Sequence, residues 1–187
     1  MDTTTIDLKA FCEPEAPHLA EPFWREGHMY ATNGKICVRV PAESGELGHA
    51  KAPSAHNLKW WWDDDNAFEW EPLPAATEKK VRCRYCDGDG RNPDVTCKCP
   101  KCGNDYFPCE DCDGKGYWKE WETVHIGGFS FGGQLVHLLS SLPNPIVFAS
   151  EQPCENKGNV AGVLRVKFDG GQAILMGLEF RREGVTP

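Results

Sequence analysis

The sequence predicts an α+β fold: a mostly antiparallel sheet with one main helix, interrupted by a small cysteine-rich insertion. Short strands separated by turns recur on both sides of the insertion, and a single amphipathic helix follows it. Seven of the ten cysteines fall between residues 83 and 112. We therefore divide the 187 residues into an N-terminal part of the scaffold (1–77), an inserted module (78–119) and a C-terminal part of the scaffold (120–187).

The N-terminal part contains a predicted β-hairpin over residues 28–40. Asn33-Gly34 is a preferred sequence for a type I′ turn, and residues 36–40 after it alternate between apolar and polar side chains. Residues 41–59 are rich in Gly, Ala, Ser and Pro, which is typical of a loop.

An aromatic and acidic run follows this loop, and it consists of Trp60, Trp61, Trp62, Asp63, Asp64 and Asp65. Three adjacent tryptophans fit neither the stripe of a helix nor the alternation of a strand. In one interpretation, one or two of them fill the core while the acids face water. In the other, the run is exposed and anchors a protein partner, because tryptophan is strongly enriched at interaction hot spots. We take the run as the candidate partner-binding site.

Charge is unevenly distributed along the chain, whose net charge is −8. Residues 1–77 hold 6 Lys and Arg against 13 Asp and Glu, whereas residues 78–119 hold 9 against 8. Non-specific affinity for nucleic acid comes from clustered cations. Only the module offers such cations, and they alternate with aspartates, so the composition does not favour a general phosphate-binding surface.

The module opens and closes with the same eight-residue pattern, CxxCxGxG, at residues 83–90 and 109–116. Two residues between cysteines let both thiolates face one ion from a tight turn, and two such turns complete a tetrahedral site. Glycines with positive φ let backbone N–H groups turn toward the sulfurs. A segment with so few large apolar residues needs bound metal to fold. We predict a structural zinc site formed by Cys83, Cys86, Cys109 and Cys112.

Three inner cysteines, Cys97, Cys99 and Cys102, lie between the two units. Their CxCxxC arrangement supplies three thiolates to a second zinc, which then needs a fourth ligand. The candidates for that ligand are Asp94, Asp105, His125 and a water molecule. The sequence leaves open whether the chain binds one zinc ion or two.

On these motifs, the module resembles the cysteine-rich zinc-binding domain of DnaJ-type co-chaperones, whose unit is CxxCxGxG. In that family the first and last units share one zinc, so the resemblance implies that Cys83 and Cys86 share an ion with Cys109 and Cys112. The family has four full units and two zincs, whereas the inner two are compressed here. The His-Pro-Asp tripeptide of a J-domain is absent from the sequence, so co-chaperone activity is not implied.

After the module, residues 117–126 are predicted to form a strand that ends at Gly127-Gly128. The amphipathic helix comes next, and its apolar residues at helical spacing are Phe131, Leu135, Leu138, Leu139 and Leu142. A short strand over 146–149 and a hairpin over 163–178, with its turn at residues 169–171, complete the chain.

This order of strand, helix and three strands is clamp-like, because it resembles the β-α-β-β-β order of one half-domain of a DNA sliding clamp. The helices of a clamp face DNA with Lys and Arg, whereas the polar positions of this helix are Gln134, His137, Ser140 and Ser141. The resemblance therefore implies a fold or a partner surface and not the encircling of DNA.

The sequence contains no P-loop, GxSxG elbow, HExxH helix or dinucleotide-binding glycine fingerprint, and its six histidines are scattered. We therefore predict a non-enzymatic zinc-binding protein that acts by contact with a protein partner. Compact acidic chains with DnaJ-like knuckles and no J-domain are similar to small phage and prophage accessory proteins. That resemblance implies an inhibitor or modulator of host nucleic-acid or defence machinery.

Two alternatives stay open at this point. One is a zinc-dependent nucleic-acid-binding protein that uses the Lys and Arg of the module. The other is a thiol-disulfide oxidoreductase or chaperone-like protein that uses a CxxC pair. The acidic N-terminus lacks a long apolar segment, which predicts neither export nor membrane insertion, and we expect a cytoplasmic location.

Overall fold

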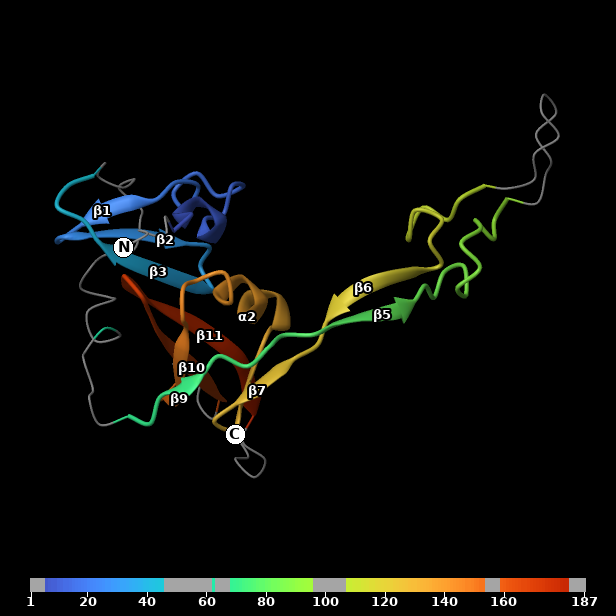
Figure 1. The fold of residues 1–187 in the computed structure, drawn as a ribbon. Coiled ribbons are helices and arrows are strands. Elements are labelled where there is room, and N and C mark those ends of the chain that lie inside the picture. The colour runs from blue at the N-terminus through green and yellow to red at the C-terminus, as the bar shows by residue number, and fades with distance from the viewer. Residues whose placement is uncertain (1–5, 46–61, 63–67, 96–106, 154–158, 182–187) are drawn as a thin grey trace. The chain divides into compact units, whose positions relative to one another are not determined.

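A computed structural model describes residues 6–45, 62, 68–95, 107–153 and 159–181. The chain divides into two units, which we describe separately: unit 1 is Met1–Ala76 with Thr123–Pro187, and unit 2 is Thr77–Glu122. The predicted α+β fold class is confirmed. The described strands pair antiparallel, one short α-helix accompanies them, and the cysteine-rich region is a small insertion (Figure 1).

Unit 1 is built on a seven-stranded sheet with the order β1-β2-β3-β11-β10-β9-β4. Its strands are β1 (Phe23–Arg25), β2 (His28–Thr32), β3 (Ile36–Pro41), β4 (Glu71–Pro72), β9 (Ile146–Pro153), β10 (Asn159–Phe168) and β11 (Gly171–Arg181). At its centre β3 pairs with β11, from Arg39 opposite Gln172 to Ile36 opposite Leu175. The two parts of the scaffold, separated in the sequence by unit 2, therefore form one sheet.

The predicted hairpin is present as β2 and β3, but its turn differs from the expected type. A type I′ turn requires positive φ at both central residues, and of Asn33 and Gly34 only the glycine has it, at 85°. Asn33 instead accepts hydrogen bonds at its side-chain Oδ1 from the backbone N–H groups of Lys35 (3.0 Å) and Ile36 (2.9 Å). The asparagine stabilises the turn through its side chain and not through its φ.

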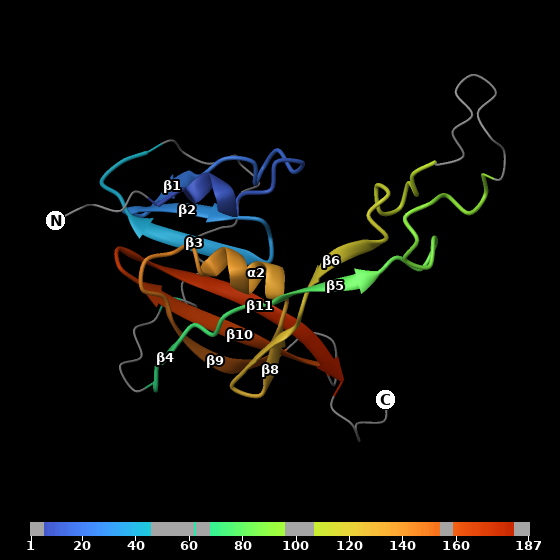
Figure 2. The ribbon, with the colours of Figure 1, turned by 45° about the vertical axis from the view of Figure 1, so that its right-hand side comes forward.

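The larger core of unit 1 lies between one face of the sheet and the helices. Helix α2 (Gly133–Leu139) lies over this face in both views of the ribbon (Figures 1 and 2), and it buries Val136 and Leu139. The alternating strand residues Val38, Leu164 and Leu175 point into the same cluster. Among the described residues, no helix has both the length and the apolar character that crossing a membrane requires.

Helix α2 is shorter than the periodicity predicted because its expected first residue belongs to a strand. Phe131 lies in β8 (Phe129–Phe131), which forms a small hairpin with β7 (Val124–Ile126). In that hairpin Phe131 is opposite Val124. The phenylalanine enters the same apolar cluster from the hairpin, so its spacing mimics one turn of the helix.

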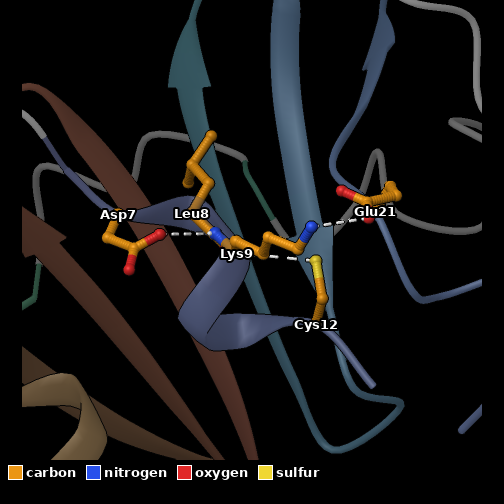
Figure 3. A network of polar contacts seen from close by, with 5 residues as sticks. All are labelled: Asp7, Leu8, Lys9, Cys12 and Glu21. Atoms are coloured by element: carbon orange, nitrogen blue, oxygen red, sulfur yellow. Dashed lines mark hydrogen bonds and ion pairs between the residues drawn. The ribbon is translucent and has the colours of Figure 1, made fainter. Parts of the chain in front are cut away.

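A short 3-10 helix, η1 (Leu8–Phe11), adds the buried Phe11 to this core, and its polar contacts are shown in Figure 3. Asp7 caps it, since its Oδ1 accepts the backbone N–H of Lys9 at 3.1 Å. The Nζ of Lys9 donates to Glu21 at 2.7 Å, and the thiol of Cys12 donates to the carbonyl of Leu8 at 3.8 Å. The segment is thereby tied both to its own backbone and to the chain that precedes β1.

A second apolar cluster covers the opposite face of the sheet, and Trp62 is part of it. The indole is 8% exposed; its ring centroid lies 6.2 Å from that of Tyr30, and Cζ of Arg39 lies 4.3 Å above it. Trp62 is therefore a buried residue of this second core cluster. Trp60, Trp61, Asp63, Asp64 and Asp65 lie outside the described residues.

We expect Trp62→Ala to lower the free energy of unfolding of unit 1 by about 3 to 5 kcal/mol, because it leaves a cavity beside Tyr30 and removes the ring under Arg39. Trp62→Phe is the control: it keeps an aromatic ring, and it removes an indole N–H that has no hydrogen-bond partner among the described residues. Denaturant unfolding followed by circular dichroism measures both variants. Equal stability of the wild type and the alanine variant would contradict the core placement.

Unit 2 begins with a two-stranded ribbon formed by β5 (Glu78–Arg82) and β6 (Tyr117–Trp121). The strand predicted over 117–126 is interrupted after β6, where the N–H of Glu122 donates to the carbonyl of Thr77 at 2.9 Å. That hydrogen bond closes unit 2. The residues after it form β7 and pair with β8, so two short strands replace the single long one.

Candidate metal centre

Four cysteines form a buried cluster at the end of the β5–β6 ribbon. The sulfurs of Cys83, Cys86, Cys109 and Cys112 all lie within 4.8 Å of one another, and none of the four residues is more than 6% exposed. Cys83 directly follows β5, and Cys112 precedes β6 by a few residues. The ribbon therefore brings together two cysteine pairs that are far apart in the sequence.

Each cysteine pair lies in a loop with the same internal hydrogen bonds. In the first loop the N–H of Gly88 donates to the carbonyl of Cys83 at 3.1 Å, and the N–H of Asp89 donates to that of Cys86 at 3.0 Å. In the second loop the corresponding bonds, each 3.0 Å long, run from Gly114 to Cys109 and from Lys115 to Cys112. The two CxxCxGxG units thus form one repeated structure.

The last glycine of each unit donates a hydrogen bond to a sulfur. The N–H groups of Gly90 and Gly116 lie 3.2 Å from the Sγ atoms of Cys86 and Cys112, and both glycines have a φ of 76°. The positive φ turns the N–H toward the sulfur, as the sequence pattern predicts. Such bonds stabilise a thiolate and offset the charge that four thiolates bring to one ion.

The two loops also interlock through their backbones. The N–H of Cys83 donates to the carbonyl of Gly116, and the N–H of Cys109 donates to that of Gly90, both at 2.9 Å. A Cβ on Gly90 would lie 2.3 Å from the carbonyl oxygen of Gly114, and one on Gly116 would lie equally close to that of Gly88. The loops are therefore related by an approximate two-fold axis, and only glycine fits where they meet.

The geometry of the cluster fits a zinc ion. Four sulfurs bound about 2.3 Å from one zinc at the corners of a tetrahedron are about 3.8 Å apart. The distance is 3.8 Å between the sulfurs of Cys83 and Cys109 and also between those of Cys86 and Cys112. The cluster is thus one tetra-cysteine group that could hold a metal ion such as zinc.

The protonation of the thiols agrees with this chemistry. Desolvation by burial raises the pKa of Cys109 to about 12. At Cys86 the desolvation is outweighed by hydrogen bonds from the N–H of Gly90 and from Cys83, so its pKa falls to about 7. Four thiolates do not form together in a buried site without a cation, and binding of a dication therefore releases protons.

The proposed ligands of a second zinc fall into two groups. Cys97, Cys99, Cys102 and Asp105 lie outside the described residues. Asp94 accepts a hydrogen bond from the hydroxyl of Tyr85, which raises the pKa of that tyrosine to about 12. In unit 1, His125 is hydrogen-bonded through Nδ1 to the hydroxyl of Ser130 at 2.8 Å. Asp94 and His125 thus each have a structural partner of their own.

Aromatic residues beside the cluster were not singled out from the sequence. Trp118, in β6, packs against the four cysteines, and Tyr85, between the first two, is 40% exposed. The run Tyr117-Trp118 directly after the last glycine of the pattern is the signal that could have indicated an aromatic wall there. The pairing of β6 with β5 decides which ring of this run, that of Tyr117 or that of Trp118, faces the sulfurs.

Comparison with protein-family models, with curated proteins and with solved structures finds no match for this chain. The resemblances described above therefore rest on the CxxCxGxG motif and on the order of strands and helix.

Proposed function

We propose that this chain is a non-enzymatic zinc-binding protein that acts through contact with another protein. Zinc held by Cys83, Cys86, Cys109 and Cys112 keeps unit 2 folded in this proposal. The observation that carries it is the two-fold arrangement of the loops, in which each unit supplies two sulfurs and one N–H···S hydrogen bond.

The need for metal follows from how little else holds unit 2 together. The described apolar cluster of this unit consists of the four cysteines, with Trp118 packed against them. A unit of this size without a larger apolar core depends on a metal or on disulfides for stability. Binding of zinc then supplies much of the folding free energy of the unit.

The ligand set favours a structural role for the ion. Four thiolates fill a tetrahedral site, whereas catalytic zinc keeps one position for water or substrate. A closed site stabilises the loops and displays their outer residues. Tyr85 is such a residue, because it is exposed between two ligands and its hydroxyl is held by Asp94. Tyrosine is among the residues most enriched at protein interfaces.

The charge of the chain supports a protein partner more than nucleic acid. Four of the seven Lys and Arg in the described part of unit 2 are already matched by carboxylates of the same unit: Arg82 with Asp87, Arg91 with Asp89, Lys115 with Asp113 and Lys119 with Glu78. The net charge of −8 opposes approach to phosphates. The resemblance to phage accessory proteins suggests host replication, transcription or defence machinery as the class of partner.

Zinc stoichiometry by elemental analysis, with native mass spectrometry on the untreated protein, tests the proposal. One zinc per chain is the result expected from the four-cysteine cluster, and two would mean that Cys97, Cys99 and Cys102 bind another ion. Protein without zinc would overturn the proposal.

Removal of zinc is expected to make the four clustered thiols reactive. Titration with a thiol reagent, before and after treatment with a strong chelator, should show four additional reactive thiols per chain. Thiolates bound to the ion are shielded from the reagent, and the loops open when the ion is removed. If these thiols react fully while zinc is still bound, the cluster is not its site. Catalytic turnover of a disulfide substrate by the zinc-free protein would instead favour the thiol oxidoreductase.

A further inference from the structure

A cavity of about 310 Å³ lies in unit 2, between the second cysteine loop and β6. Asp111 and Asp113 line it from the loop, and Tyr117 and Trp118 line it from the strand. Its volume is at the lower end of the range for small-ligand sites. A small group with both an aromatic-compatible surface and positive charge would match these walls.

The lysines beside the cavity already have partners, whereas one aspartate does not. Lys115 pairs with Asp113 at 3.5 Å, and Lys119 pairs with Glu78 at 2.5 Å. Asp111 is exposed, and no hydrogen bond or ion pair joins its carboxylate to another described residue; only its backbone N–H is engaged, with the sulfur of Cys109. Among the described residues, the cavity therefore offers one carboxylate without a partner, and its positive groups are neutralised.

Cys112 also lines the cavity, which makes its wall more negative when zinc is bound. A zinc ion with four thiolates carries a formal charge of −2, and this charge at the wall rests on the proposed function. Anions, including the phosphates of a nucleic acid, are repelled from such a wall, and a cation is attracted to it.

The aromatic walls are suited to a flat cation. The indole of Trp118 is held in place, because its Nε1–H donates to Glu120 at 3.0 Å and its ring packs on the cysteines. The ring of Tyr117 already carries a cation on one face, since Nζ of Lys80 lies 4.6 Å from its centroid. Cations over Trp and Tyr rings are stabilised by the ring quadrupole.

We propose that this cavity binds the guanidinium of an arginine side chain from a basic segment of the partner protein. A guanidinium stacks on an aromatic ring and donates to a carboxylate in the same plane, which the ammonium of lysine does not do. Asp111 accepts its N–H groups, and Trp118 or Tyr117 stacks against it. Zinc binding and partner binding are linked in this proposal, because the same loop forms the wall of the cavity.

The test uses the zinc-loaded full chain and the peptide acetyl-Gly-Gly-Arg-Gly-Gly-amide, with the same peptide containing neutral citrulline as the ligand control. NMR follows the indole N–H of Trp118 and the backbone amides of residues 111–119. We expect saturable chemical-shift changes with the arginine peptide. The dissociation constant of the citrulline peptide should be higher by about two- to five-fold.

Two exposed neighbours provide matched variants. Asp111→Asn removes the carboxylate in the cavity, and Glu110→Gln removes one negative charge from the adjacent residue, which does not line it. We expect Asp111→Asn to lower the affinity for the arginine peptide about two- to five-fold, and Glu110→Gln to change that affinity much less. Equal effects of the two variants would mean that only overall charge matters, and the cavity would be rejected.

Zinc content is measured on every sample, so that the two proposals fail in different ways. If zinc-loaded protein shows no chemical-shift changes with the arginine peptide, only the proposal that the cavity binds arginine is overturned. If the protein binds no zinc, the proposed function is overturned, and the proposal for the cavity fails with it. Shifts of the Trp118 indole by a single-stranded oligothymidylate and not by the peptide would also overturn the proposal, in favour of nucleic acid.

Discussion

Replacing Cys83 with serine is expected to release the zinc ion of the cluster and to unfold unit 2, while the seven-stranded sheet of unit 1 stays folded. Structural zinc sites contribute about 10 to 16 kcal/mol of apparent binding free energy at neutral pH, and a serine hydroxyl is a poor substitute for a thiolate. We expect zinc affinity to fall by more than about 100-fold, since changes behind the ligands alone cost about 10- to 100-fold.

The loss should be confined to one zinc and one unit. Elemental analysis is expected to show about one zinc fewer per chain, and NMR should show loss of dispersion for amides of residues 77–122 only. Cys12→Ser is the matched control, because Cys12 is also a buried free thiol but belongs to unit 1, in which its Sγ contacts the carbonyl of Leu8. An unchanged zinc content in Cys83→Ser would remove that cysteine from the site.

Replacing Gly116 with alanine is expected to damage the site almost as strongly, although glycine supplies no ligand. The new Cβ would lie 2.3 Å from the carbonyl oxygen of Gly88, which is backbone and cannot turn aside. The two loops must then separate, which breaks the bond from Cys83 N–H to the carbonyl of Gly116, and the shift of Gly116 also weakens its N–H···S bond to Cys112 within the second loop. We expect about a 10- to 100-fold loss of zinc affinity, measured by competition with a chromophoric chelator.

Gly88→Ala is the control for the positive φ alone. Gly88 has a φ of 82°, close to the 76° of Gly116, but the three atoms nearest to its Cβ would all belong to the side chain of Arg82, the first of them at 2.8 Å, and none to the backbone. An alanine in this left-handed conformation costs about 1 to 2 kcal/mol at either position. The loss of zinc affinity in Gly116→Ala beyond that in Gly88→Ala measures the effect of the contact between the loops. If both variants lose the same affinity, the close approach of the two backbones is not what the site requires.

Local sequence determines the pieces of this protein that depend only on near neighbours. Two residues between cysteines and a glycine at the end of each unit predict sulfurs and N–H groups facing one point, and the described loops have this arrangement. Alternating apolar residues likewise predict the strands on either side of Asn33-Gly34, because this pattern also depends only on residues near one another in the sequence. The type of that turn differed from the prediction because the side chain of Asn33 competes for the backbone N–H groups.

The role of Trp62 could not be predicted because it depends on distant residues. Its surroundings come from Tyr30 and Arg39 on the sheet, whereas the sequence around it shows only tryptophans and aspartates. A hot-spot residue and a core residue have the same local signature, since both are large and apolar. Burial alone distinguishes them.

The sequence by itself determined the α+β class and the four cysteines that form the cluster, because strand alternation and ligand spacing are encoded over a few residues. Only the tertiary structure decided that β3 lies beside β11, that Gly116 contacts the carbonyl of Gly88, and that Trp118 faces the sulfurs. Each of these contacts joins segments far apart in the chain. Their geometry follows from how sheets and loops pack together, which no short stretch of sequence specifies.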